Sequence, residues 1–424
     1  MATHQDLSAL FVARTTQQYL AEGGSFAFVM PNAVLDRGYY AGFRAGNYPD
    51  STDPIAVRFT GSWDLRRLRP HFFPRGAAVV FGQRSTTQFG TPLPSKTTRW
   101  TGQLPRDNDT WDVVSGHIAQ HDADLVVHDE EMIGSPYGKR FAQGATIVPR
   151  VLFMVEKQQS GPLGLAAGRQ TVRSARSSTE KKPWKELVSL VGVVETEFIR
   201  PTLLGESVLP FRVLPPRYAV LPLESTELLD GEHARLDRYP GLADWWRRAE
   251  QLWLYHRSSD RLSLRERLDF RRGLTDQLPI PPLRIIYGAS GMHVVAALIE
   301  NPTAICEHKL YWGAVANHAE GFYLCSILNS PLITDLVRPF MSYGKDERDI
   351  DKNVWKLPIP VFDGNNPTHR RLSELGGQCT DLVADLDLAD SGNFVTLRRR
   401  VRAALAADPT AAEINEIVLE LLAT

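Results

Sequence analysis

Basic side chains gather in the segment 157–185, among glycines and serines that favour a flexible loop. A single acid, Glu180, opposes the seven Lys and Arg residues of this segment. They are Lys157, Arg169, Arg173, Arg176, Lys181, Lys182 and Lys185. Such a loop can follow a phosphate backbone, because each cation displaces condensed counterions. Gln170 and Arg173 are residue types that read base edges. The alternative interpretation is a solvated surface loop.

A second basic run lies near residue 350, where Arg348 and Lys352 are four positions apart. This spacing would place both side chains on one face of a helix, where they could contact nucleic-acid phosphates. Acids are interleaved with them, so that the net charge of 345–352 is −1. The alternative interpretation is therefore an exposed turn held by salt bridges.

Two triplets, Glu307-His308-Lys309 and Glu180-Lys181-Lys182, match the short Glu-x-Lys half of a magnesium-dependent nuclease site. In such a site the carboxylates hold magnesium and the lysine stabilises the attacking water or the scissile phosphate. The sequence shows no preceding Asp at the expected distance on a hairpin, and short triplets are common by chance. A nuclease is therefore the less favoured hypothesis.

Two histidines, His117 and His121, have the spacing of a helical metal-ligand pair, with His128 further on. The glutamate that usually follows the first ligand is replaced by Ile118, which favours an ordinary surface or core role. We expect no metal site in this chain.

An aromatic group formed by Trp245, Trp246, Trp253 and Tyr255 could stack on an extruded or unpaired base. The same spacing is typical of the buried face of a helix, and we favour that interpretation.

The bulk composition is that of an ordinary globular protein of 424 residues, with 43% hydrophobic and 23% charged residues. Lys plus Arg number 48 and Asp plus Glu 49, so any nucleic-acid site must be a local patch. The three cysteines, Cys306, Cys325 and Cys379, are scattered, which favours a reducing cytoplasm over a disulfide framework. We find neither a signal-peptide pattern nor an apolar run of about 20 residues, so we expect a cytoplasmic protein without a membrane partner.

The hydrophobic pattern divides the chain into four parts. Residues 1–85 read as helix, strand, helix, strand, strand, and the apolar run Phe26 to Met30 suits a central parallel strand. Residues 86–135 are polar and read as a linker or loop region. Strand and helix patterns mix in 136–362, and 363–424 read as helices.

Four segments share an order with a known family. They are 24–32 (Gly-Ser-Phe-Ala-Phe-Val-Met-Pro-Asn) with 39–44, then 63–82, then 141–150, and finally 327–330 with Arg348, Lys352 and 358–360. In this order they resemble the later part of adenine-N6 DNA methyltransferases of the Asn-Pro-Pro-Tyr class, including fused type IIG restriction-modification enzymes. The resemblance covers roughly residues 5–375. It implies an α/β chain: a C-terminal remnant of a Rossmann-like methyltransferase sheet, then a mixed α+β target-recognition domain and a helical tail.

The chain departs from this family at the catalytic residues. The family holds S-adenosylmethionine on a glycine-bearing loop and the target adenine on Asn-Pro-Pro-Tyr. The only Pro-Pro pairs here, 215–216 and 281–282, follow Leu214 and Ile280. The segment 288–291 (Gly-Ala-Ser-Gly) lacks a further glycine and an acidic ribose partner. We assign no catalytic and no cofactor-binding residue, and Met1 would lie beyond the family's active site.

Three hypotheses follow. In the first, this chain is the DNA-binding half of a site-specific methyltransferase, and a second polypeptide supplies the catalytic motif and S-adenosylmethionine; a gene fragment would give the same sequence. Its DNA-binding residues would be Arg169, Gln170, Arg173, Arg176, Lys181, Lys182, Lys185, Arg348 and Lys352. The second is a stand-alone DNA-binding or interaction protein, which would need a closed N-terminal sheet. The third is the magnesium-dependent nuclease.

Overall fold

The computed structural model describes most of the chain. The described residues are 7–48, 54–71, 76–105, 109–125, 134–159, 164–177, 179–341, 348–388 and 393–423. The third histidine of the sequence analysis, His128, lies outside them. The chain divides into a first unit, Met1–Met132 with Phe340–Asp349, and a second unit, Ile133–Pro339 with Ile350–Thr424. Each is described by itself.

A mixed sheet with strand order β1-β4-β3-β5-β6 forms the first unit, and β2 pairs with β3. Among the strands of the described residues, β3 and β5 pair in parallel, and the other neighbours pair in antiparallel fashion. Its strands are β1 (Ser25–Pro31), β2 (Asn47–Tyr48), β3 (Ile55–Arg69), β4 (Ala77–Arg84), β5 (Lys96–Gln103) and β6 (Ile118–Asp124). Its helices are α1 (Ser8–Tyr19), α2 (Ala33–Asp36), α3 (Ala41–Arg44) and α4 (Trp111–Ser115).

The apolar core of the first unit lies on one face of this sheet. Side chains of α1, α2 and α3 pack there against β3 and β4 and include Val12, Leu35, Phe43, Phe59 and Val80. The opposite face is more open, because Val29 is 52% and Trp63 is 39% exposed.

The expectation of a central parallel strand at Phe26 to Met30 is wrong. Among the described residues β1 pairs with β4 alone, in antiparallel fashion, and ends the sheet. Its burial alternates along the strand because helices cover only one face. A run of apolar residues does not by itself distinguish an edge strand from a central one.

The polar segment 86–135 is not a loop throughout, since β5, α4 and β6 come from it. These strands are rich in Thr, Gln, His and Asp, and β6 exposes most of its residues. A strand with polar residues on both faces lacks the alternation that identifies strands from sequence.

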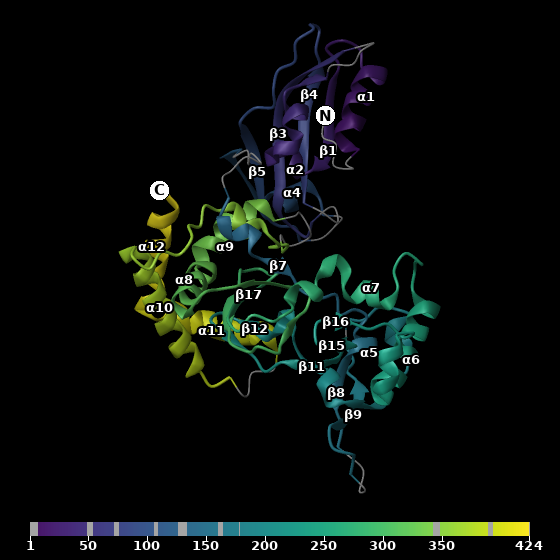
Figure 1. The fold of residues 1–424 in the computed structure, drawn as a ribbon. Helices are drawn as coiled ribbons and strands as arrows, with labels where there is room; N and C mark the ends of the chain where they lie inside the picture. Colours follow the sequence, from purple (N-terminus) through teal and green to yellow (C-terminus); the bar gives the residue numbers. More distant parts are fainter. Residues whose placement is uncertain are drawn as a thin grey trace. The chain divides into compact units, whose positions relative to one another are not determined.

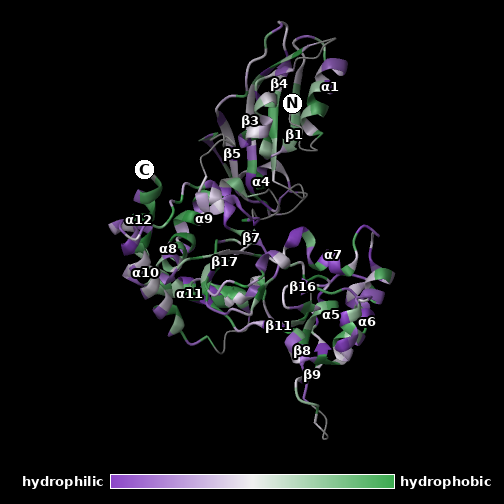
Figure 2. Cartoon of the chain, in the orientation of Figure 1, coloured by the Kyte–Doolittle hydropathy of each residue, from purple (hydrophilic) through white to green (hydrophobic). Residues whose placement is uncertain are grey.

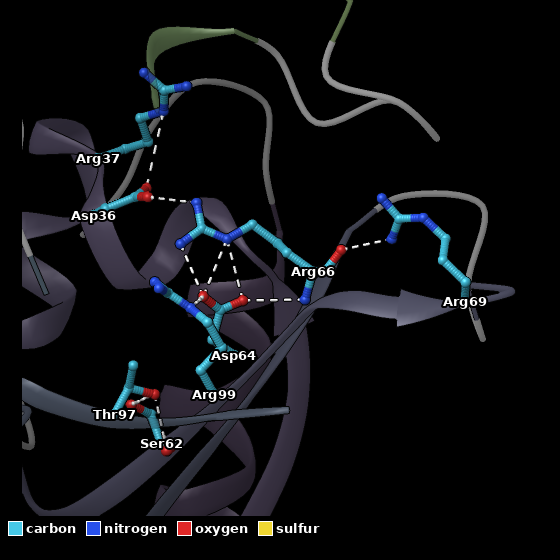
Figure 3. A network of polar contacts seen from close by, with 8 residues as sticks. All are labelled: Asp36, Arg37, Ser62, Asp64, Arg66, Arg69, Thr97 and Arg99. Atoms are coloured by element: carbon cyan, nitrogen blue, oxygen red, sulfur yellow. Dashed lines mark hydrogen bonds and ion pairs between the residues drawn. The ribbon is translucent and has the colours of Figure 1, made fainter. Parts of the chain in front are cut away.

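A buried carboxylate, Asp64, ties β3 to β5 and to α2 (Figure 3). Its side chain is fully buried and lies 2.9 Å from the Arg66 Nη2 atom and 3.0 Å from the Arg99 Nε atom. Arg66 also reaches Asp36 on α2, at 3.1 Å. Burial alone would raise the pKa of Asp64. The hydrogen bonds and charge of Arg66, with the charge of Arg99, hold this pKa below its usual value.

The second unit contains two main sheets. The larger has the order β10-β9-β8-β14-β11-β19, and the smaller β18-β17-β20-β7. The strands of the larger sheet are β8 (Met154–Lys157), β9 (Arg169–Ser174), β10 (Val191–Glu195), β11 (Ile199–Leu203), β14 (Arg217–Val220) and β19 (Ile305–Cys306). Those of the smaller are β7 (Ala142–Gln143), β17 (Arg284–Gly288), β18 (Ala296–Ile299) and β20 (Leu310–Ala314). Two short hairpins pair β12 (Val208–Leu209) with β13 (Arg212–Val213) and β15 (Leu223–Glu224) with β16 (Glu227–Leu228).

Helices cover both sheets. The helices α5 (Arg150–Phe153), α6 (Pro240–His256) and α7 (Leu264–Leu268) contribute to the core of the larger sheet. Trp245 and Trp246 are fully buried in it, which confirms the core interpretation for these two residues. Figure 2 shows hydrophobic and hydrophilic residues along α6, as expected of a helix with one buried face.

Five further helices gather beside the smaller sheet (Figure 1). They are α8 (His318–Asn329), α9 (Pro331–Val337), α10 (Pro367–Ala384), α11 (Phe394–Ala406) and α12 (Pro409–Ala423). A side chain at Gly376 would collide with the Phe322 carbonyl and Ser326, so glycine allows α10 to approach α8 closely. Within the described part of the chain, no helix has both the length and the apolar character needed to span a bilayer.

We predict that Asp64→Asn destabilises the first unit by roughly 3 kcal/mol, because it removes the buried counter-charge of Arg99 and one of the two carboxylates that pair with Arg66. Since the folded pKa of Asp64 is lowered, its contribution is present above about pH 4 and is lost as pH falls through the folded value. Hydrogen exchange of β3 and β5 amides at neutral and acidic pH measures both effects. Asp122→Asn on the exposed part of β6 is the control. Equal exchange rates in the two variants would show that the network contributes nothing.

Candidate functional site

A cavity of about 790 Å³ lies in the second unit, near the start of α5 and the end of α6. Four parts of the chain line it, 148–150, 177–184, 253–267 and 307–309. Seven basic side chains and two carboxylates face it. The basic residues are Arg150, Lys181, Lys182, Arg257, Arg261, Arg267 and Lys309, and the acids are Glu180 and Glu307. We call this the basic cavity.

The turn 307–309 brings one of the Glu-x-Lys triplets to the basic cavity. It connects β19 in the larger sheet to β20 in the smaller one. The Glu307 N–H donates to the Leu203 carbonyl at 3.0 Å, and the His308 N–H donates to the Ala145 carbonyl at 2.7 Å. A side chain at Gly144 would collide with the carbonyls of Cys306 and Glu307, so only glycine permits this approach. The backbone thus fixes the triplet.

The Glu307 carboxylate is almost fully buried. Its Oε1 atom accepts from the Gly205 N–H at 2.8 Å and lies 3.6 Å from the Arg150 Nη2 atom. Burial raises the pKa of Glu307, although Arg150 and the Gly205 N–H oppose the shift. A carboxyl group of this kind can accept a hydrogen bond from a ligand with little competition from water.

The second carboxylate of the cavity, Glu180, is held by the backbone of α5 and by Arg176. Its Oε1 atom accepts from the Val151 N–H at 2.8 Å, and its Oε2 atom lies 3.6 Å from the Arg176 Nη2 atom. The Arg176 guanidinium also donates to the carbonyls of Trp184, Lys185 and Leu187. Arg176 therefore shapes the turn beside the cavity.

Two indole rings, Trp184 and Trp253, contribute an aromatic wall. Their centroids are 5.6 Å apart and their planes differ by 17°. The Trp253 indole N–H donates to the Leu262 carbonyl at 3.0 Å, which fixes the end of α6 against the loop 257–262. Of the four aromatic residues considered from sequence, only Trp253 lines this cavity, and Tyr255 is 83% exposed.

The residues expected to bind DNA do not form one loop. Arg169, Gln170 and Arg173 belong to β9, so the prediction of a continuous flexible loop over 157–185 is wrong for this stretch. Arg169 pairs with Glu195 at 3.4 Å, and Arg173 lies opposite Glu156 across the sheet. The Gln170 amide donates to the carbonyls of Gln158 and Thr171. Acids thus offset the charge on this face.

The lysines that follow have a different position. Lys181 and Lys182 line the basic cavity, and Lys185 lies in the turn next to it. Lys182 forms an ion pair with Glu186 at 2.5 Å, and both side chains are largely exposed. The sequence cluster therefore separates into a charge-balanced strand face and a basic cavity wall.

Arg348 and Lys352 do not share a helical face. Residues 348–352 form a bridge and a turn, and Asp351 has a φ of 41°. Arg348 is exposed in the first unit, whereas Lys352 belongs to the second unit and donates to the Gly138 carbonyl at 3.3 Å. The expected i, i+4 pair is thus wrong, because the turn interrupts any helix there.

Sequence reasoning missed most of the cations of the cavity. Arg150, Arg257, Arg261 and Arg267 come from segments up to 117 positions apart, and none stands in a basic run, whereas Lys309 was considered only as part of a Glu-x-Lys triplet. The only local signal was the segment 256–261, His-Arg-Ser-Ser-Asp-Arg, directly after a predicted helix.

Both Glu-x-Lys triplets line the same cavity, which the sequence did not indicate. Among the residues that the structure describes, however, no three His, Cys, Asp or Glu side chains are grouped as metal ligands. His117 follows the end of α4 and His121 lies on β6, so the two are not on one helix. The arrangement therefore offers cations and acceptors for an anionic ligand rather than a ready magnesium site.

The glycine segment 288–291 does not fit S-adenosylmethionine. It connects the antiparallel strands β17 and β18, whereas a nucleotide-binding loop leads from a parallel strand into a helix.

Comparisons with known proteins give similarity in structure only. No protein-family model matches the chain, and no curated protein matches it. One similar solved structure is the type IIL restriction-modification enzyme MmeI in complex with DNA, at 9% identity and a TM-score of 0.54. The match covers 98% of this chain and 47% of that one. A second is the type IIG restriction endonuclease BpuSI, at 11% identity and a TM-score of 0.30, covering 97% of this chain and 49% of that one.

The chain thus spans about half the length of both enzymes. The match to MmeI shows that the two chains share a fold over this length. The fold is a mixed α/β arrangement with several sheets, and a Rossmann-like remnant in the first unit remains an expectation.

The environment of His308 in the basic cavity predicts how this imidazole titrates. Burial, with the positive charges of Lys309, Arg267 and Arg150, lowers the pKa of His308 to about 4. The folded chain therefore keeps this imidazole neutral while the unfolded chain takes up a proton below about pH 6.5, so stability is lost as pH falls from about 6.5 to 4.

Nuclear magnetic resonance of histidine-labelled protein should show one imidazole titrating near pH 4 that is absent from His308→Gln. Lys309→Gln should raise this pKa, and Arg370→Gln, far from the cavity lining, should leave it unchanged. Titration of His308 near 6.5 would contradict the described electrostatics.

Proposed function

We propose that this chain is the DNA-binding, target-recognition half of a site-specific adenine-N6 DNA methyltransferase of the restriction-modification type. The observation that carries the proposal is the shared fold with MmeI over 98% of the chain, because MmeI is a restriction-modification enzyme solved in complex with DNA. The order of sequence segments that resembles adenine-N6 methyltransferases supports the finer assignment to this reaction.

The basic cavity supports a role in DNA binding. It concentrates seven Lys and Arg side chains on one part of a protein whose net charge is only −1. A local field of this kind attracts phosphates without a basic surface elsewhere. The proposed DNA-contacting residues remain Arg169, Gln170, Arg173, Arg176, Lys181, Lys182, Lys185, Arg348 and Lys352, of which Lys181 and Lys182 lie at the cavity.

The open sheet of the first unit supports a partner polypeptide. Among the described residues, the outer edge of β1 has no neighbouring strand. Val29, Trp63 and the 63% exposed Trp111 leave apolar surface uncovered. Such edges and patches favour association with another chain. We assign the catalytic motif and S-adenosylmethionine to this partner.

The same feature weighs against a stand-alone DNA-binding protein, which needs a closed or protected sheet. If the chain acts alone, no second polypeptide binds the exposed apolar face of the first unit. The proposal predicts that this face is an interface with the partner.

We predict that the triple substitution of Lys181, Lys182 and Lys185 by Gln weakens duplex binding at least tenfold at moderate salt. It should also reduce the magnitude of the slope of log K against log salt concentration by up to about 3, because each lost phosphate contact reduces that slope by about 0.9. Arg176 is left intact, since its hydrogen bonds hold the turn that carries these lysines.

Fluorescence anisotropy with a labelled duplex at several salt concentrations makes this measurement. The control substitutes three exposed arginines of the second unit, Arg238, Arg370 and Arg399, by Gln. If the lysine variant and the control have the same salt slope as the unchanged chain, this wall of the cavity does not contact DNA.

A further inference from the structure

Unmet hydrogen-bonding capacity is concentrated at the basic cavity. Eight buried side-chain nitrogen or oxygen atoms in the described residues have no hydrogen-bond partner. Four belong to residues that line this cavity: Glu180 Oε2, Arg267 Nε, Glu307 Oε2 and His308 Nδ1. Because buried polar groups are nearly always paired in folded proteins, this concentration indicates a place for a polar ligand or ordered water.

The lining is polarised from its buried end to its mouth. Glu307 is 1% exposed and uses only Oε1 toward the protein, so Oε2 remains an acceptor. Lys182 and Arg261 are exposed, and Arg257 is half-buried. A matching ligand carries a hydrogen-bond donor at one end and negative charge at the other.

The aromatic wall and the volume define the middle of this ligand. Trp184 and Trp253 offer parallel indole rings, which favour a flat ring system. A volume of about 790 Å³ falls within the range of roughly 300–1,000 Å³ typical of small-molecule sites. A duplex is too large to enter such a cavity and can contact only its exposed rim, where Lys182 lies, whereas a single nucleotide fits inside.

We propose that the basic cavity binds one nucleotide whose base carries an amino group at its major-groove edge, as cytosine and adenine do and guanine and thymine do not. The amino group donates to Glu307 Oε2 at the buried end, since Glu and Asp accept from base amino groups. The phosphate lies at the mouth with Arg257, Arg261 and Lys182. The base lies beside Trp184 and Trp253. This ligand is distinct from the duplex of the proposed function.

Glu307→Gln provides a sharp test because the Gly205 N–H must still be accepted by the side-chain oxygen. The amide nitrogen then occupies the position of Oε2 and presents a donor. The variant should lose affinity for amino-bearing bases and keep its affinity for thymine, whose O4 atom accepts. A purely structural role of Glu307 would change all nucleotides alike.

The experiment is calorimetric titration of the full chain with dCMP, dAMP, dTMP and inorganic phosphate. We expect dCMP and dAMP to bind about tenfold more tightly than dTMP and phosphate, and Glu307→Gln to abolish that preference. Substituting Arg257 and Arg261 by Gln together should weaken every phosphate-bearing ligand about tenfold. The matched control replaces Arg370 and Arg399 by Gln and should change nothing.

Two results would overturn the proposal: no binding of dCMP or dAMP at millimolar concentration, which leaves the cavity to water, or an equal loss for all nucleotides in Glu307→Gln. Thermal unfolding checks that each variant folds. If Glu307→Gln does not fold, Glu180→Gln is measured in its place as a second variant of the cavity lining.

A further titration identifies the source of the nucleotide. Duplexes with one unpaired cytosine or one unpaired thymine present the same chemistry from DNA. A cytosine preference that depends on Glu307 assigns the nucleotide to DNA, and a preference seen only with mononucleotides assigns it to free nucleotides. Either result is independent of fully paired duplex binding, so failure here and failure of the proposed function are distinguishable.

Discussion

The close backbone approach between Gly144 and the segment 306–307 determines how the second unit is built. At this point the chain leaves the larger sheet through β19 and enters the smaller one through β20. The buried Gln277 side chain completes the junction, because its amide donates to the Cys306 carbonyl at 3.0 Å and accepts from the Cys306 N–H at 2.8 Å. A side chain at Gly144 would separate the two sheets. The floor of the basic cavity depends on this junction, since Glu307 follows Cys306 directly.

Electrostatics around this floor explain the character of the cavity. Arg150 and the Gly205 N–H compensate only one oxygen of Glu307, and burial together with the surrounding cations lowers the pKa of His308 and keeps it neutral. Placing like charges together costs free energy in the folded state, and such arrangements concentrate at functional sites. The cavity therefore combines a positive field with specific acceptors, which is the combination needed to attract a phosphate and orient the group attached to it.

Local sequence patterns predicted where helices and strands occur better than they predicted which strands pair. The apolar periodicity of 363–424 gave helices, and α10 is one of them, because it buries one face. The strand at 25–31 was found, but its neighbours were not, since pairing depends on segments 46 to 58 positions away. Polar strands such as β5 were missed because they bury little apolar surface.

The candidate site was predictable only in part. Lys181 and Lys182 stand in a basic run and were found, whereas Arg150 and Arg267 are single cations that folding brings together. Arg176 was assigned to DNA by its charge, yet its hydrogen bonds show that it also shapes the turn. Charge counts along a sequence cannot separate these roles, because both need the same guanidinium group.

Selection from a randomised duplex library tests the central claim most directly, since target recognition means preference for a base sequence. The full chain is incubated with the library at physiological salt, and the bound duplexes are sequenced over successive rounds. The account predicts enrichment of one defined site. A bound pool with the same base distribution as the starting library would contradict it.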